Sequence, residues 1–358
     1  MPLSHPRQSD GDRHATPNLT VMQLKCIKKW ECSPGPDMCI SIPGLALPLT
    51  TWSLDPFRIM PATPRPPGTL REGATLSRVA IFTDSASDMD PAEAAAYGIG
   101  VIPLLVTFGT QTFRAGVDLT GPQFWERMTA PDAPFPTTAA SSPAEFKDAY
   151  EKAFEAGAEA VVSIHVAGSL SGTIKSAQIA RDMLPDREIH IVDSLGASLA
   201  QGILCHMGLE MVADDRPASE IADTLQGRAP DMAMYVALET LEYLKKGGRI
   251  SGAQAAIGTL LSVKPIIEVR HGVVETADRV RTRGKARERL IELITQQPIE
   301  RMAILHTVAP DVEMFRDEVI ERVPGLKRED VPIGLCGASV GPHLGPGCVG
   351  AAVMYRPS

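Results

Sequence analysis

A repeated order of strand followed by helix constrains the fold of this chain more than any other feature. Apolar runs at 79–82 and 160–166 predict buried strands, each followed by a polar turn and a helix. Three helix starts share one pattern, in which Asp90, Thr120 or Ser142 precedes a proline, and a Glu or Gln follows three residues after the cap. Strands that alternate with helices form a parallel sheet covered by helices on both faces. The first half of the chain therefore predicts a parallel α/β lobe.

Hydroxyl and carboxyl groups follow these predicted strands. Ligands of open α/β sheets bind at the carboxyl ends of the strands. Polar residues occur there at Asp84-Ser85, at Thr137-Thr138 in a loop before a helix, at 169–172 and at Asp193-Ser194. The other elements expected in this half are strands at 99–107 and 188–192, and helices that end near 129 and 156, begin after 172 and span 195–213.

The second half of the chain predicts a second lobe. Lys264 to Val269, His271-Gly272 and Val273 to Thr276 are typical of a β-hairpin, which implies antiparallel pairing. Further expected elements are strands at 232–238, 302–308, 332–337 and 349–355, and helices at 239–246, from Ser251, at 283–296 and at 311–322.

The expected fold class is α/β with two lobes: an N-terminal lobe with a parallel sheet and a C-terminal lobe with a mixed or antiparallel sheet. We assign the lobes to 78–230 and 231–358, which together form a single unit at 78–358. Residues 1–77 are rich in proline and lack a period of 2 or 3.6, so we expect a disordered extension there.

Composition narrows the possible functions. A chain of 358 residues that is 44% hydrophobic can bury the cores of two lobes. A formal net charge of −8 argues against a nucleic-acid partner, and the lack of an apolar run of about 18 residues argues against stable membrane insertion. Six irregularly spaced cysteines and the lack of a secretory signal favour a reducing compartment. We therefore expect a cytoplasmic protein without a metal site.

The junction from Val166 to Ala177 predicts a binding site for an acidic group. Its small residues let the backbone approach a ligand, and its hydroxyls and the free N–H groups of a helix start can donate to an oxygen anion. Ser171 is the first candidate donor, and a helix N-cap is its structural alternative. Asp84 and Asp193 are candidate general bases or metal ligands. We favour a role in which they brace the site, beside Ser85 and Ser194, by accepting from loop N–H groups.

Seven segments of the chain, taken in order, resemble the signature segments of the DegV family. They are Thr83-Asp84-Ser85, Pro136-Thr137-Thr138, Leu170-Ser171-Gly172-Thr173, Val192-Asp193-Ser194, Leu244-Lys245-Lys246-Gly247-Gly248-Arg249-Ile250, Lys264-Pro265 and His343-Leu344-Gly345-Pro346-Gly347. That family comprises bacterial fatty-acid-binding proteins, some of which present the fatty acid to a dihydroxyacetone-kinase-like fatty acid kinase. The resemblance covers about Arg78 to Tyr355.

The resemblance implies an acyl chain buried between two lobes. It implies that hydroxyls and basic side chains hold the carboxylate, and the matching positions are Thr137, Thr138, Ser171, Gly172, Arg249 and His343. A turn role for the threonines and a helix-end role for Arg249 are the alternatives from the residues alone. This chain departs from the family pattern at Ala139-Ala140 and Ala167-Gly168, where members usually carry polar residues.

The leading prediction is a carrier that performs no chemistry itself and needs no cofactor. Its ligand would be a long-chain fatty acid such as palmitate or oleate, and its partner a dihydroxyacetone-kinase-like fatty acid kinase. No nucleotide-binding motif occurs at a strand–helix junction. The alternative is a serine hydrolase or acyltransferase with Ser171 as nucleophile and His343 as base, although Gly168 to Gly172 lacks the G-x-S-x-G order. The basic run at 279–289 predicts a solvated surface, or else a surface for a partner.

Overall fold

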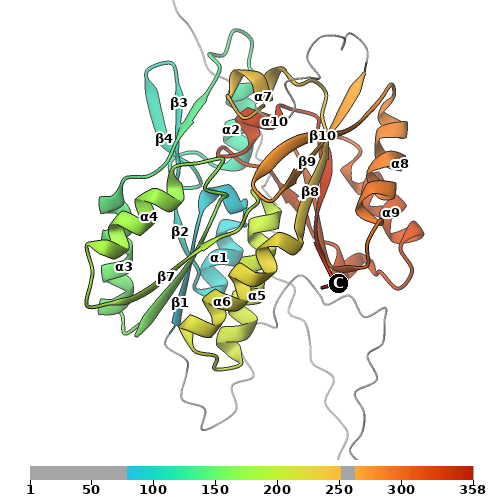
Figure 1. The fold of residues 1–358 in the computed structure, drawn as a ribbon. Helices are drawn as coiled ribbons and strands as arrows, with labels where there is room; N and C mark the ends of the chain where they lie inside the picture. Colours follow the sequence, from blue (N-terminus) through green and yellow to red (C-terminus); the bar gives the residue numbers. More distant parts are fainter. Residues whose placement is uncertain (1–78, 251–262, 358) are drawn as a thin grey trace, which may run out of the picture. The chain divides into compact units, whose positions relative to one another are not determined.

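A computed structural model describes residues 79–250 and 263–357 of the chain (Figure 1). Within these residues the chain forms two α/β lobes, one on a four-stranded parallel sheet and the other on a six-stranded mixed sheet. The fold class expected from the sequence is confirmed. The extension at 1–77 and the helix expected from Ser251 lie outside the described residues.

The first lobe is built on the parallel sheet, in the order β2-β1-β6-β7. Its strands are β1 (Val79–Asp84), β2 (Gly100–Ile102), β6 (Ala160–His165) and β7 (Glu188–Asp193). Its helices are η1 (Ser85–Ser87), α1 (Pro91–Tyr97), α3 (Pro143–Glu155), α4 (Thr173–Asp182), α5 (Leu199–Ala213), α6 (Ala218–Arg228) and η2 (Ala229–Asp231). The expected helix starts form as predicted, because Asp90 caps α1 and Ser142 closes a capping box at α3.

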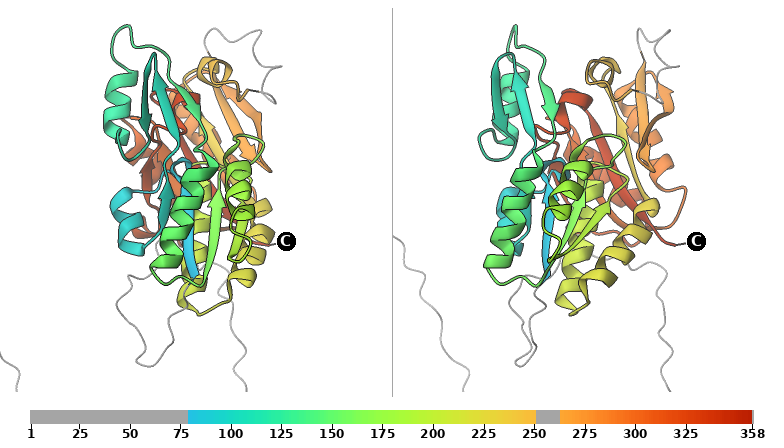
Figure 2. Two further views of the ribbon diagram at one scale, coloured as in Figure 1. Left: turned by 90° about the vertical axis from the view of Figure 1, so that its left-hand side faces the viewer. Right: turned by 60° about the vertical axis from the view of Figure 1, so that its left-hand side comes forward.

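A third, small sheet was not anticipated from the sequence. The strands β3 (Leu105–Phe108), β4 (Gln111–Arg114) and β5 (Thr137–Ala139) form an antiparallel sheet beside α2 (Gly121–Met128), at the top of both views in Figure 2. The single strand predicted at 99–107 is wrong: it divides into β2 and β3, which join different sheets. Pro103 lies between them and has no N–H to continue a ladder.

The second lobe is built on the mixed sheet, in the order β10-β9-β8-β13-β11-β12. Its strands are β8 (Met232–Ala237), β9 (Lys264–Arg270), β10 (Val273–Val280), β11 (Ile299–His306), β12 (Ile333–Leu335) and β13 (Val349–Tyr355). Its helices are α7 (Glu242–Lys246), α8 (Arg283–Ile294), α9 (Val312–Arg322), η4 (Arg328–Asp330) and α10 (Gly341–Leu344). The predicted hairpin is present, and its turn residues His271 and Gly272 both have positive φ, as a type I′ turn requires.

Helix α5 lies between the two main sheets. It contacts β1 and β6 of the parallel sheet and β8, β11 and β13 of the mixed sheet, as Figure 1 shows. Its first seven residues, Leu-Ala-Gln-Gly-Ile-Leu-Cys, are apolar on nearly all sides, which is typical of a helical segment that is buried all round. One hydrophobic cluster therefore runs from Ile81 and Ile164 through Leu204 to Met234 and Val236.

Helix α5 begins later than the sequence predicts, and α6 was not predicted. Residues 195–198 form a loop because Asp193 Oδ1 accepts from Leu195 N–H at 2.9 Å and Ser194 Oγ accepts from Gly196 N–H at 3.3 Å. Such local side-chain bonds compete with the helical pattern. None of the described helices is both long and apolar enough to cross a membrane.

The basic run at 279–289 has partners within its own lobe. Three of its arginines, at 283, 287 and 289, pair with the carboxyl groups of Asp311, Glu239, Glu318, Asp278 and Glu292. Arg287 is the most enclosed of the three, with 13% of its side chain exposed. Three of the six basic side chains of this run are therefore paired inside the second lobe.

Candidate functional site

A mostly apolar cavity of about 120 Å³ lies between the two sheets. Leu104, Val166 and Leu170 of the first lobe line it, together with Met234, Ile267 and Val269 of the second. Five of the predicted site residues also line this cavity, and we call them the site cluster: Thr138, Ser171, Gly172, Arg249 and His343.

The members of the site cluster come from four different local structures. Thr138 lies on β5, Arg249 follows α7, and His343 lies on α10, where the sequence suggested only a loop. Ser171 and Gly172 stand at the junction between β6 and α4. Thr137 is not part of the cavity lining: it is exposed, because successive side chains of a strand point to opposite faces.

Thr138 and His343 meet although 205 positions separate them in the sequence. Thr138 Oγ1 lies 3.2 Å from His343 Nε2, while His343 Nδ1 is buried and without a hydrogen-bond partner among the described residues. Burial, and then the nearby Arg249, lower the pKa of His343 to about 4. The ring is therefore neutral at pH 7, and its Nε2 can carry a proton for donation.

Arg249 brings the only full charge to the cavity lining formed by the described residues. Its Nε donates to the carbonyl of Leu170 at 3.1 Å, and its Nη1 donates to the carbonyl of Gly247 at 2.8 Å. No carboxyl group between 79 and 250 or between 263 and 357 lies within ion-pair distance of it. A half-buried guanidinium without a counter-charge is a ready partner for an anion.

Ser171 lies at the start of α4, as the sequence suggests. Its Oγ lies 2.7 Å from Thr173 Oγ1 and accepts from Thr173 N–H at 3.3 Å. The hydroxyl thus supports the helix start and still lines the cavity. No hydrogen bond joins Ser171 to His343, and the described residues place no carboxyl group to orient His343. The geometry favours donors around an anion over a nucleophile and its base.

Asp84 lies beneath the site in a fully buried network. Its carboxyl group accepts from Ala86 N–H at 2.9 Å and Val166 N–H at 3.1 Å, and it also lies 2.9 Å from His165 Nδ1. His165 Nε2 contacts Ser163 Oγ at 2.7 Å, and Tyr150 donates to the same oxygen at 2.8 Å. The order Asp84, His165 and Ser163 has the connectivity of a catalytic triad, but all three are fully buried. Substrate has no access to Ser163.

The other predicted bracing residues occupy loops around the site. Asp193 accepts from Gly168 N–H at 3.2 Å and from Leu195 N–H at 2.9 Å, and Ser194 is buried beside it. Ser85 Oγ accepts from Leu104 N–H at 2.8 Å and lies 2.8 Å from Ser339 Oγ. No group of three or more potential ligand side chains in the described part of the chain is arranged to hold a metal ion.

Several residues of the site were missed by sequence reasoning. Ser339 lines the cavity with a hydroxyl, and His165 and Ser163 hold Asp84 in place. Ser163 and His165 alternate along a strand whose side chains are buried on both faces. A polar residue in such a strand must find a buried partner, and that signal could have identified both.

Gly247 fixes the position of the His343 ring. A Cβ at this position would overlap with His343 Nδ1, whereas a Cβ at Gly248 would meet no atom within 4 Å. We expect Gly247→Ala to displace the ring and to weaken binding of an anionic ligand by about tenfold or more, because a charge-assisted hydrogen bond is lost. Affinity for palmitate, measured by titration calorimetry, tests this.

The neighbouring Gly248→Ala variant is the matched control. Gly248 has a φ of +70°, so alanine there introduces strain of about 1–2 kcal/mol without touching His343. It should lower the melting temperature and leave the affinity unchanged. Equal affinities in the two variants would show that His343 does not contribute to binding.

The fold and the site define a class of protein. The chain is a two-lobed α/β protein with an apolar cavity between its sheets, and the lining of that cavity carries one cation without a counter-charge among the described residues. A family model described as "Uncharacterised protein, DegV family" matches residues 78–356. A DegV domain-containing protein of Deinococcus radiodurans is 37% identical over 279 residues, which cover 77% of this chain and 98% of the relative. The chain belongs to the DegV family.

Solved structures agree with this assignment. A fatty-acid-binding DegV family protein from Thermus thermophilus superposes with a TM-score of 0.72 at 32% identity, covering 78% of this chain and all of the other. A stearic-acid-binding protein from Eubacterium ventriosum superposes with a TM-score of 0.70 at 25% identity, covering 77% of this chain and 98% of the other. The resemblance inferred from the seven segments is confirmed at the level of the family.

Proposed function

We propose that this protein binds a long-chain fatty acid between its two lobes, with the acyl chain in the apolar cavity and the carboxylate at the site cluster. Arg249 carries this proposal, because it is a cation at the polar end of an apolar cavity and has no counter-charge among the described residues. The fatty acids bound by relatives from Thermus thermophilus and Eubacterium ventriosum support the same ligand class. Palmitate and oleate are the proposed ligands, and no cofactor is required for binding.

The acyl chain supplies most of the binding free energy. Burial of a methylene is worth about 0.8 kcal/mol, so a palmitate-length chain gains on the order of 12 kcal/mol before the costs of ordering. The cavity of about 120 Å³ lies below the range of about 300–1,000 Å³ typical of ligand pockets. Apolar side chains along it therefore have to rearrange when a long chain enters. The site cluster sets the orientation of the ligand, because an unpaired buried carboxylate would cost several kcal/mol.

Native mass spectrometry followed by lipid extraction tests this function. Protein purified from cells, or mixed with palmitate or oleate, should carry one fatty acid. Ser171→Ala and His343→Ala should each weaken retention by about tenfold, the effect of losing one hydrogen bond to a charged group. Ser176→Ala is the control, because Ser176 lies on α4 outside the cavity lining. A chain that neither carries nor takes up a fatty acid would rule out the proposal.

We further propose that the bound carboxylate is presented to a dihydroxyacetone-kinase-like fatty acid kinase, and that this chain performs no chemistry itself. The sequence lacks a nucleotide-binding motif, which supports a role in binding for this chain and leaves the ATP-dependent step to the kinase. ATP should be consumed only when the loaded chain is mixed with such a kinase. ATP turnover by the chain alone, or labelling of Ser171 by a fluorophosphonate probe, would instead favour an enzyme.

A further inference from the structure

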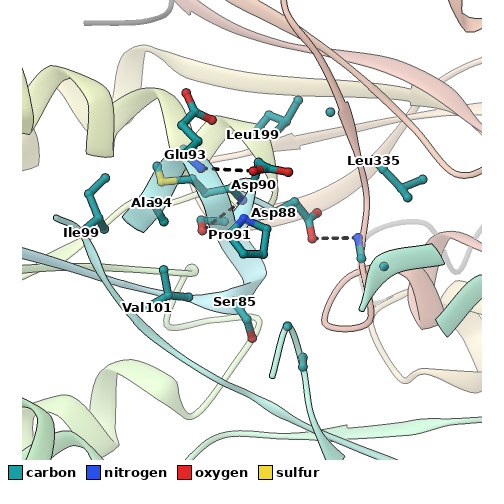
Figure 3. A pocket seen from close by; sticks show the side chains of 18 of the residues that line it. Ser85, Asp88, Asp90, Pro91, Glu93, Ala94, Ile99, Val101, Leu199 and Leu335 are labelled. Carbon is teal, nitrogen blue, oxygen red and sulfur yellow. Dashed lines mark hydrogen bonds between the residues drawn. The ribbon is translucent and has the colours of Figure 1, made fainter. Parts of the chain in front are cut away.

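A second and larger cavity lies outside the fatty-acid site. Its volume is about 660 Å³, within the range of about 300–1,000 Å³ typical of ligand pockets. It is lined by η1, α1 and the first turns of α5 on one side, and by β12 and the loop after it on the other (Figure 3). None of the residues of the site cluster lines it. The two cavities therefore have different linings.

The charges of the two cavities have opposite signs. The larger cavity is lined by three carboxyl groups, of Asp88, Asp90 and Glu93, and by His206 and His306. No lysine or arginine occurs among its described lining residues. The fatty-acid cavity, in contrast, carries a single cation and no carboxyl group among the described residues that line it.

The described residues pair no lysine or arginine with the carboxyl groups of the larger cavity, and Asp90 accepts from Ala92 N–H and Glu93 N–H at the start of α1. Asp88 accepts from Ser198 Oγ at 2.7 Å and from Gly337 N–H at 2.8 Å, and burial raises its pKa to about 7. Burial, and then the neighbouring Asp90, also raise the pKa of Glu93. No lysine or arginine of the described residues forms an ion pair with either group. A cation in the cavity would relieve the cost of ionising them.

His206 lies beside Glu93 in the wall of the larger cavity. Its Nε2 lies 3.5 Å from Glu93 Oε1, and its side chain is 12% exposed. Its Nδ1 is buried without a hydrogen-bond partner among the described residues. Burial, and then the nearby Arg301, lower the pKa of His206 to about 4, so the ring is neutral at pH 7 and does not neutralise Glu93.

The walls of this cavity are apolar. In Figure 3, Ile99 and Val101 lie on one side of the carboxyl groups, and Leu335 lies on the other. Leu199 and Ile203 of α5 complete the wall. An apolar body combined with a single positive head matches this lining, whereas an anion would meet only like charges.

We propose that the larger cavity is a second ligand site, for a small organic cation. The ammonium group of the ligand lies beside Glu93 and Asp88, and its apolar body lies against Ile99, Val101 and Leu335. The two cavities share no lining residue, and Ser85 Oγ of the larger cavity lies 2.8 Å from Ser339 Oγ of the smaller one.

Three probes with the same hexyl chain test the charge of the ligand. Hexylammonium, hexanol and hexanoate are titrated at pH 7.5 into the full chain loaded with palmitate, so that the fatty-acid site is occupied. Hexylammonium should bind at least tenfold more tightly than hexanol, and hexanoate should not bind. Equal binding of hexylammonium and hexanol, tighter binding of hexanoate, or no binding of any probe would overturn the proposal.

Two variants locate the binding. Ala95 is exposed on α1 and lines the cavity, so Ala95→Trp should block hexylammonium without disturbing the core. Glu93→Gln keeps the shape and should reduce the preference for hexylammonium over hexanol to about twofold or less. Glu155→Gln, on the exposed end of α3, is the control and should change nothing. Unchanged hexylammonium binding in both cavity variants would place the probe elsewhere and refute the site.

Discussion

Replacing Arg249 with alanine is expected to weaken palmitate binding by about 10- to 100-fold, the largest loss at any residue of the site cluster. Arg249 is the only cation lining the fatty-acid cavity among the described residues. Without it, the buried carboxylate retains hydroxyl and imidazole donors but no counter-charge. Arg249→Lys should restore part of the affinity, because an ammonium keeps the charge and loses the forked geometry of the guanidinium. Titration calorimetry with delipidated protein measures both effects.

Hexadecanol separates the loss of charge from a loss of structure. Arg249 also ties the lobes together, through its bond to the carbonyl of Leu170. If the charge matters, Arg249→Ala weakens palmitate binding far more than hexadecanol binding. Arg289→Ala is the matched control, because Arg289 pairs only with carboxyl groups outside the cavity. Equal losses for palmitate and hexadecanol would show that Arg249 acts by holding the lobes together.

Asp84→Ala is expected to lower the free energy of unfolding by about 3–5 kcal/mol. The substitution leaves His165 Nδ1 and the N–H groups of Ala86 and Val166 without their acceptor, and all of them are buried. Denaturant unfolding of the delipidated chain measures the loss. Removing lipid first is necessary, because a ligand bound only to the native state adds to its stability.

Asp193→Ala is the comparison that makes this prediction specific. Asp193 also accepts from two loop N–H groups, but it is only half-buried and its carboxyl group has no hydrogen bond to a histidine. Its loss should cost about 1 kcal/mol. Similar losses at the two positions would show that the buried network around His165 adds little to stability.

Local sequence signals predicted the elements whose geometry is decided by neighbouring residues. The helix starts at Asp90 and Ser142 follow from side chains that bond their own first turn. The hairpin at His271-Gly272 follows from its two turn residues. In each case the interacting groups lie within a few positions of one another, so the pattern is complete in the sequence.

The remaining elements depend on contacts between distant segments. Residues 99–107 form two strands because the chain passes from one sheet to another at Pro103. The alternation of apolar residues along the sequence does not reveal this change of sheet. Only one of Thr137 and Thr138 can line the cavity, because their side chains point to opposite faces of β5. The pairing of β5 with β3 determines which face is turned to the cavity. Resemblance to the family supplied Arg249 and His343 as candidates, while their contacts with Leu170 and Thr138 required the structure.

The buried position of α5 bears on how quickly a ligand can exchange. Opening the lobes like a hinge would expose the apolar cluster that α5 shares with both sheets, at about 25 cal/mol for every Å² uncovered. Local movement around the site cluster uncovers much less surface. If the protein binds a fatty acid as proposed, uptake and release of the acyl chain should therefore proceed through loops and side chains beside the cavity, on the microsecond-to-millisecond scale of such motions.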